Sequence, residues 1–458
     1  MVREDAISSN ELRTGAALSF IFVCLFMVAI YARPEDVFPS IAELHLTFLL
    51  GVCAAVSFLW CLFSGDVSLT WPRELRLVLL LTMWFAAGVP FAYWRGGSFI
   101  VLTQVWLKTA LIFFLLTQTL ITLQRVRVVL WAIILSELVV TAYSLAAPSQ
   151  VTWKACLSCE ASGVGNRMVG VSHGFLYWNV LGIALGMTMP YMAALFIAKP
   201  SVLRSSLLAA TTVSMLWMQV LTASRSGTLV VAFSVILTSL LVARGSPRGK
   251  IVRAGTVLAF VVAICLAPAV FWERISTIVG GDSAAVNTVE ASADLSKQER
   301  FDLLMRSVTY TIEHPLFGLG LGNFNVANGN ELQDPEAWIG SHNTFTQISS
   351  EAGLPALLLF LALLITALRG MKRVIRLTTD DPQSIELNLM ARATLVSLLS
   401  FILGAFFAHK GYDYYVYTVP IAVAVGIKQI TAAKEMASMP IDRSLASQPQ
   451  YLNQGWTL

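Results

Sequence analysis

The chain has 458 residues, of which 56% are hydrophobic and 13% charged, and its mean hydropathy is +0.71. A soluble domain usually carries about 25% charged residues, so this composition excludes an ordinary soluble globular fold. The net charge of +4 is too small to indicate a nucleic-acid partner. Apolar residues gather in blocks of about 20, which is long enough to cross a bilayer core of about 30 Å. The sequence therefore predicts a multi-pass membrane protein.

Apolar blocks in chain order predict an all-helical protein with about twelve transmembrane helices. The polar start MVREDAISSNELRTG leads into an apolar run that ends at ARPEDVFP, not at a small-residue cleavage site, so we expect that run to remain as the first span. The expected spans are 15–31, 42–64, 74–93, 98–119, 126–147, 172–198, 203–222, 226–243, 251–271, 352–368, 388–407 and 414–432.

Basic residues predict the orientation of these spans, because cytoplasmic loops carry an excess of lysine and arginine. If twelve spans alternate, every basic loop falls on one side, which we assign to the cytoplasm together with both termini. The basic residues are Arg73, Arg76, Arg125, Arg127, Lys199, Arg204, Arg244, Arg248, Lys250, Arg253, Arg369, Lys372, Arg373 and Arg376. The opposite side receives one large insertion, residues 272–351, and an insertion of that length is seldom an idle loop.

The insertion has predicted elements of its own. The segment SKQE is a capping-box pattern, in which Ser296 caps a helix and Glu299 returns the bond, and apolar residues then follow at helical spacing. We therefore expect an amphipathic helix over 297–313, ended by Pro315 and lying at the outer membrane surface. HPLFGLGLGNF predicts a glycine-rich turn region, and SHNTFTQISSEAGLP predicts a short helix that begins near His342 and breaks at Gly353.

Three basic side chains of this outer side are candidates for a site: Arg225, Arg300 and His342. An interfacial arginine often only anchors its helix in the lipid headgroups. Guanidinium groups also bind phosphate oxygens through two parallel hydrogen bonds, and the small residues around Arg225 leave room for a ligand. His342 is either a structural residue or a general base, since an ordinary histidine pKa of about 6.5 suits base catalysis near neutral pH.

Lys108, His409 and Lys410 are secondary candidates. His409 and Lys410 fall in another outer loop and are expected to face the same site. Lys108 lies inside the fourth span, where a buried lysine costs about 2.5–3.5 kcal/mol. It either has a partner or a water-lined cavity, or it snorkels from a tilted helix. Cys156 and Cys159 form either a local disulfide or two free thiols, and we expect no metal site because no acidic or histidine cluster has ligand spacing.

The segments TASRSGTLVVAF, HPLFGLGLGNF and SHNTFTQISSEAGLPALLLFLALL together resemble the hallmark segments of the O-antigen ligase and polymerase superfamily. The resemblance covers roughly residues 221–364. It implies a lipid-dependent glycosyltransferase fold of the GT-C-like type and an inverting, metal-independent glycosyltransferase without a cofactor. It also implies a multi-pass protein of the bacterial inner membrane whose active site faces the periplasm.

The implied reaction transfers a glycan from undecaprenyl pyrophosphate, within the membrane lipid, to a lipid A core or another glycan acceptor. By motif, the family arginines correspond to Arg225 and Arg300, and the family histidine, as the catalytic residue, to His342. Arg167 is a third pyrophosphate-binding candidate, although NRMVGVSHGFLYWN departs from the usual arginine followed by Pro-Asn. We expect four regions: N-terminal spans (1–220), a ligase-like core (221–370), C-terminal spans (371–433) and a cytoplasmic tail (434–458).

Other functions remain open in the sequence. A polymerase that joins lipid-linked repeat units of an O-antigen, capsule or exopolysaccharide uses the same donor chemistry, so the motifs do not separate it from a ligase. A lipid-linked oligosaccharide flippase is disfavoured, because transporters place polar residues near the membrane midplane and the candidates here concentrate at one side. The sugar, its linkage, the acceptor and the oligomeric state are not determined by the sequence.

Overall fold

The computed structural model describes residues 14–146, 178–199, 201–222, 224–268, 271–272, 288–333, 338–412 and 417–438. Within these ranges all regular structure is helical. Arg167, Cys156 and Cys159 lie outside the described residues, and so does most of the expected tail.

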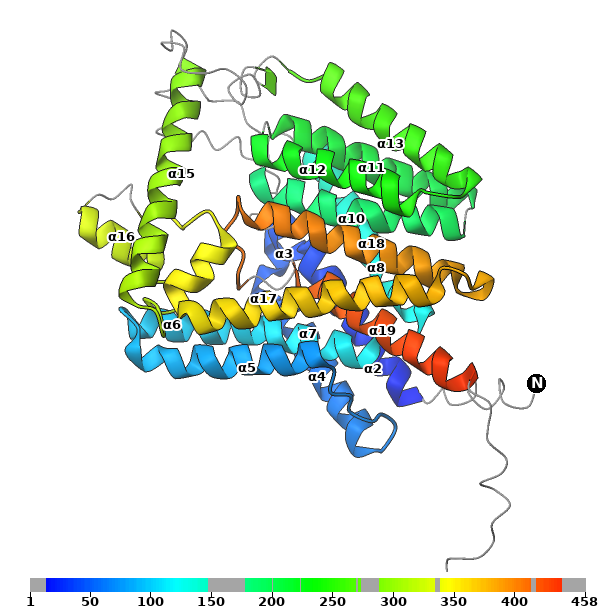
Figure 1. Ribbon diagram of the computed structural model, residues 1–458. Coiled ribbons are helices and arrows are strands. Elements are labelled where there is room, and N and C mark those ends of the chain that lie inside the picture. Colours follow the sequence, from blue (N-terminus) through cyan, green and yellow to red (C-terminus); the bar gives the residue numbers. More distant parts are fainter. Residues whose placement is uncertain are drawn as a thin grey trace, which may run out of the picture.

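A bundle of long apolar helices forms the body of the protein (Figure 1). Each of the expected spans overlaps one of these helices or a helix with its π-helical extension. They are α2 (Thr14–Ala32), α4 (Leu46–Phe63), α5 (Arg73–Gly88), α6 (Arg95–Ile100) continued by η3 (Val101–Trp106) and α7 (Leu107–Thr119), α8 (Leu123–Ala146), α10 (Trp178–Ala198), α11 (Val202–Leu221), α12 (Arg225–Leu237) continued by η4 (Thr238–Val242), α13 (Pro247–Cys265), α17 (Thr344–Thr378), α18 (Ile385–Ala405) and α19 (Thr418–Ser438). The other elements are the long helix α15 (Thr288–Glu313) and the shorter α3 (Pro34–Val37), η1 (Pro39–Leu44), η2 (Val89–Phe91), α16 (Phe324–Leu332) and η6 (Pro382–Ser384).

Eight helical segments of the described chain are long and apolar enough to cross a membrane. They comprise α4, α5 with η2, α6 to α7, α8, α10, α12 with η4, α17, and α18 with η6. The chain is thus a multi-pass membrane protein, and the count of twelve spans stays a prediction.

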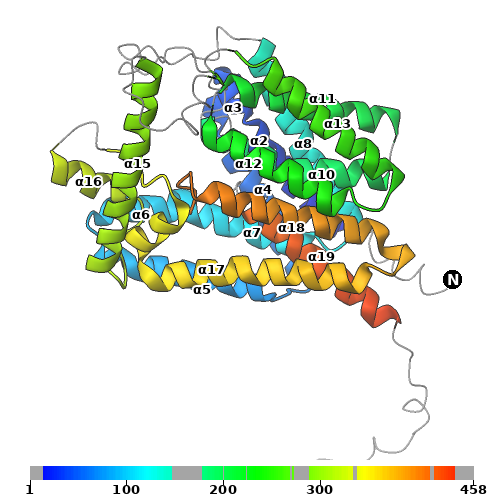
Figure 2. The same ribbon diagram turned by 45° about the horizontal axis from the view of Figure 1, so that its top comes forward.

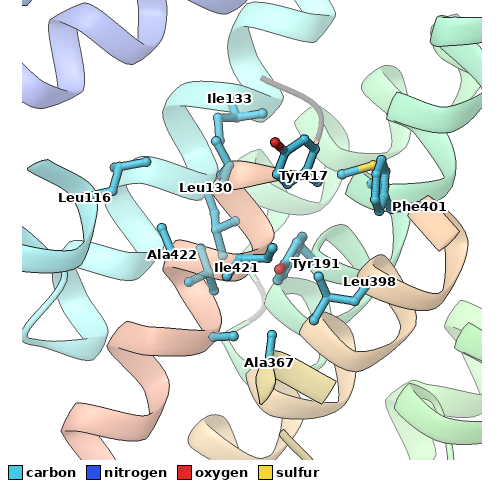
Figure 3. Close-up of a cluster of buried hydrophobic side chains, with 14 of the residues drawn as sticks. Leu116, Leu130, Ile133, Tyr191, Ala367, Leu398, Phe401, Tyr417, Ile421 and Ala422 are labelled. Atoms are coloured by element: carbon cyan, nitrogen blue, oxygen red, sulfur yellow. The ribbon is translucent and has the colours of Figure 1, made fainter. Parts of the chain in front are cut away.

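The centre of the bundle is a close-packed apolar core shared by α7, α8, α10, α17, α18 and α19 (Figure 3). The side chains of this core are buried, and their close packing holds the helices at fixed positions relative to one another. Those labelled in the figure are Leu116, Leu130, Ile133, Tyr191, Ala367, Leu398, Phe401, Tyr417, Ile421 and Ala422.

Basic loops meet at one end of the bundle. Glu386, at the start of α18, forms ion pairs with Arg127 of α8 at 3.0 Å and with Lys199, which follows α10, at 3.6 Å. Arg248 of α13 donates to the carbonyl oxygen of Ile197 at 3.3 Å. These contacts gather the expected cytoplasmic loops at one end, while α15 and α16 lie at the other (Figure 1).

Helix α15 crosses the end of the bundle at a steep angle to α17 and α5, as Figures 1 and 2 show. It buries Leu303, Ser307 and Tyr310, and its Thr311 hydroxyl lies 2.8 Å from that of Ser349 on α17. The expected end of this helix before Pro315 is confirmed. The expected start at 297 is wrong: the helix begins at Thr288, because TVEASADLS contains no proline or glycine and its alanines and glutamate favour helix.

Candidate functional site

Arg225 is the first residue of α12. Ser224 caps this helix, its side-chain oxygen accepting a bond from the backbone N–H of Gly227 at 3.2 Å. Gly182 of α10 lets the backbones of α10 and α12 touch, because a Cβ on Gly182 would overlap the backbone of Gly227. The arginine therefore sits, half-buried, at a rigidly placed helix N-terminus, where backbone N–H groups and the helix dipole favour an anion.

Arg300 comes to the same place from α15. Burial and the neighbouring charge of Arg225 both lower the pKa of Arg300, and Glu299 offsets part of this effect. The fold thus holds two like charges close together in a partly desolvated position. A bound anion between the two guanidinium groups would relieve their repulsion, and a pyrophosphate has the charge and oxygens to do so.

His342 stands directly before α17, with its backbone in the left-handed region at φ 53°. Non-glycine residues adopt this conformation rarely, and such strain clusters at functional sites. The next residue, Asn343, holds the geometry, because its side-chain oxygen accepts bonds from the N–H groups of Phe345 at 2.9 Å and Thr346 at 3.1 Å. Asn343, not His342, is therefore the cap of this helix.

A second histidine faces the first. The rings of His342 and His409 lie edge to face with centroids 5.2 Å apart, and Gly340 leaves the space that His409 fills. Burial, His409 and Arg300 together lower the pKa of His342 to about 3. Burial and Lys410 lower the pKa of His409 to about 4. Both rings are accordingly neutral at neutral pH.

The loop that carries His409 and Lys410 is bonded to the start of α17. The Thr344 hydroxyl donates to the carbonyl of Ala408 at 2.6 Å and accepts from the N–H of Lys410 at 3.1 Å. The N–H of Gly411 donates to the side-chain oxygen of Gln347 at 3.0 Å. Arg225, Arg300, His342, His409 and the Lys410 backbone thus converge at the α15 end of the bundle.

Glu351 connects the first part of α17 to the glycine-rich segment, a role that was not expected from the sequence. Its buried carboxylate accepts bonds from the backbone N–H groups of Gly322 at 3.0 Å and Phe324 at 3.1 Å. The backbone carbonyls of Ser350 and Glu351 accept from Leu319 and Gly320, each at 2.8 Å. The two motif-bearing segments, HPLFGLGLGNF and SEAGLP, therefore form one hydrogen-bonded unit. Glu351 is the first residue of the EAGLP motif, and its place in that motif is the sequence signal that could have identified it.

Gly353 completes that unit. The helix is interrupted there at φ 82°, as expected, and the N–H of Leu354 donates to the carbonyl of Pro315 at 2.8 Å. A Cβ at Gly353 would overlap the carbonyl oxygen of Leu316, so only glycine fits. The break separates the short helix behind His342 from the membrane-spanning part of α17.

Of the two alternatives left open for Lys108, the structure favours the one in which the side chain is not buried. Its side chain is exposed on the outside of the bundle, whereas the next residue, Thr109, points inward and donates to the carbonyl of Tyr412 at 2.7 Å. Successive helix residues are turned about 100° apart, which explains the difference. Lys108 therefore does not project into the bundle with the histidines.

In the described part of the chain, no group of three His, Cys, Asp or Glu residues is placed to hold a metal ion.

Fold and site together define a multi-pass helical membrane protein with a cationic, histidine-bearing site at the end away from its basic loops. Residues 210–361 match the model of the O-antigen ligase family. The matched segment is about a third of the chain and contains Arg225, Arg300, His342 and Glu351, and it supports a place in the O-antigen ligase and polymerase superfamily. A comparison with curated proteins finds no significant match. Members of this family are glycosyltransferase-like ligases and polymerases, which supports an enzyme of that general type and implies lipid-linked glycan substrates.

Proposed function

We propose that the protein transfers a glycan from undecaprenyl pyrophosphate to a lipid A core or another glycan acceptor, at the periplasmic face of the bacterial inner membrane. The observation that carries the proposal is the convergence of Arg225, Arg300 and His342 from three separate segments. Two guanidinium groups suit the pyrophosphate, and the histidine suits the acceptor hydroxyl.

The reaction is a single inverting displacement. The acceptor oxygen forms a bond to the anomeric carbon while the bond from that carbon to the pyrophosphate oxygen breaks. The electron pair leaves with the pyrophosphate, where Arg225 and Arg300 stabilise the added charge, and the hydroxyl proton passes to His342. The products are the elongated glycan and undecaprenyl pyrophosphate, and His342 then returns its proton to water.

The low pKa of His342 gives the donor a second role. A histidine with a pKa of about 3 is neutral but weakly basic. The Arg300 charge that lowers this pKa would be countered by bound pyrophosphate, because an anion favours the protonated ring. Donor binding therefore raises the basicity of His342 when the base is needed. His409 borders this ring and Lys410 follows it in the same loop, and Arg167 would add a third cation to the pyrophosphate.

The test uses purified protein in lipid nanodiscs with a lipid-linked glycan and a glycan acceptor. The expected products are a glycoside of inverted anomeric configuration and free undecaprenyl pyrophosphate, with turnover that survives EDTA. A strict requirement for magnesium or manganese, or retention of configuration, contradicts this mechanism. In proteoliposomes, movement of intact donor across the bilayer without transfer indicates a flippase. An acceptor that must itself be lipid-linked through pyrophosphate indicates a polymerase.

A further inference from the structure

Helix α15 exposes an apolar stripe that no described part of the protein covers. Phe301, Met305, Val308 and Ile312 are 61%, 50%, 39% and 73% exposed. Their spacing of four, three and four residues places them on one side of the helix. Four large apolar side chains in a row at the surface are more than a helix in water normally presents.

The remaining surface of α15 divides into two further sides. Leu303, Ser307 and Tyr310 are buried against the protein. Asp302, Thr309 and Glu313 are exposed and polar. The helix thus has one side for protein, one for water and one apolar side, which is the pattern of a helix lying in a membrane interface.

The apolar stripe continues into the surface of a membrane-spanning helix. Leu316, in the turn that follows α15, is 61% exposed, and the adjacent Pro315 carbonyl is bonded to the N–H of Leu354. Leu354 and Leu358 are exposed on α17, one of the helices able to cross the membrane. The exposed leucines of α17 therefore begin next to Leu316, where the chain leaves α15.

We propose that this stripe, made of Phe301, Met305, Val308, Ile312 and Leu316, is inserted in the bilayer leaflet at the α15 end of the bundle. The steep angle between α15 and the spanning helices lays it along the membrane plane (Figures 1 and 2). Its polar side then faces water, and its apolar side contacts the acyl chains of that leaflet. Continuity with the hydrocarbon-facing surface of α17 favours lipid over a second copy of the chain.

Insertion of α15 has a consequence for the donor, and this consequence rests on the proposed function. Arg300 directly precedes Phe301, and the half-buried Leu304, one turn further on, connects Arg300 to the stripe. A pyrophosphate attached to a membrane lipid would therefore reach Arg300 from the hydrocarbon side of α15. The helix that binds the donor headgroup would also define the depth at which it is held.

Spin labels test the insertion without any turnover. Single cysteines replace Met305 or Ile312, with Asp302 and Thr309 as matched positions on the polar side, in a chain whose six native cysteines are replaced by alanine. In nanodiscs, we expect labels at 305 and 312 to be several-fold more accessible to oxygen than to a water-soluble nickel complex, and labels at 302 and 309 to show the reverse. Nickel access at 305 and 312 overturns the proposal. Protection from both reagents also overturns it, because it indicates a protein partner.

A charge-insertion pair tests the consequence for the donor. Ile312→Glu should raise KM for the lipid-linked donor several-fold, whereas Thr309→Glu should leave it unchanged, because only the first charge enters the hydrocarbon. If both variants behave alike, the coupling to donor entry is wrong. If the labels show insertion but no glycan is transferred, the proposed function fails and the insertion stands. If glycan is transferred while the stripe is in water, the inference fails alone.

Discussion

Arg225 and Arg300 carry like charges that the fold holds within electrostatic reach of each other, and Arg300 in turn acts on His342. Glu299 offsets part of this effect at Arg300. Helix α12 is held by its Ser224 cap and α15 by its buried side chains, and neither contact depends on these charges. An anionic donor between the two guanidinium groups would weaken their mutual repulsion.

The planar fork of Arg225 is the first property to test. Arg225→Lys keeps the charge but loses the two parallel hydrogen bonds to phosphate oxygens, so we expect glycan transfer to fall by about 10-fold or more while the protein still inserts in the membrane. Arg300→Ala should reduce transfer at least as much. The measurement is kcat/KM with lipid-linked donor in nanodiscs. Donor affinity and turnover that both remain at the wild-type level would exclude the pyrophosphate clamp.

His342 is the expected general base. His342→Ala should reduce kcat by about 100-fold or more, while donor binding persists because both arginines remain. His314→Ala is the matched control, since His314 is an exposed turn residue that follows α15. A nearly active His342→Ala together with an inactive His409→Ala would move the base to the neighbouring loop. If neither variant is impaired, leaving-group stabilisation alone carries the reaction.

The two histidines also predict how stability depends on pH. Their pKa values are about 3 and about 4 in the folded protein, below the ordinary value of 6.5, so between these limits the unfolded chain binds more protons. The free energy of unfolding should therefore fall as pH drops below about 6.5. Thermal unfolding of His342→Gln/His409→Gln in detergent should lose less stability than wild type between about pH 7.5 and 5. Equal slopes for both proteins would contradict the assignment.

At the scale of elements, the site depends on the pairing of the glycine-rich turn with the short helix behind His342. The sequence predicted the helix break at Gly353, because glycine followed by Leu-Pro is a local signal. It did not predict that Glu351 binds the N–H groups of Gly322 and Phe324, because that contact joins segments about 30 residues apart and leaves no local pattern. The capping-box pattern at Ser296 misled for the opposite reason: it is local, and strong helix formers precede it.

Gly353→Ala tests this element. The added Cβ would meet the Leu316 carbonyl and the φ of 82° would be strained, so we expect a destabilisation of order 1–3 kcal/mol and loss of activity with it. The matched control is Gly255→Ala on α13, where a Cβ meets nothing within 4 Å and alanine favours the helix. Thermal unfolding in detergent measures both. A Gly353→Ala protein as stable as Gly255→Ala would show that the break is not required.

For the whole molecule, hydropathy alone placed the helices close to where they are found, because each apolar block has the length that a bilayer requires. The direction of individual side chains was less predictable, because the pattern of a uniformly apolar helix does not reveal which side packs inward. Lys108, for example, is at the surface. The expected topology placed Arg300 and Arg225 on the same side of the membrane, and the family motifs then assigned both to one site. The apolar helices have no polar side that would show how they pack, so the sequence does not predict which helix ends lie close together in space.

The last large-scale prediction is the orientation of the protein in the membrane, and it depends on whether α13 crosses the bilayer. Helix α13 is not among the eight segments that satisfy both length and composition, because basic residues such as Lys250 and Arg253 occupy its first turns. If basic loops remain in the cytoplasm and α13 nevertheless crosses, a reporter fused after Arg248 should read cytoplasmic and one fused after Ser283 external. Alkaline phosphatase and green fluorescent protein fusions at both positions give opposite signals for the two sides. A fusion after Asp380, between α17 and α18, is the control and should agree with the one after Arg248. If Arg248 and Ser283 report the same side, α13 lies along the membrane, and the placement of α15 and Arg300 on the external face must be abandoned.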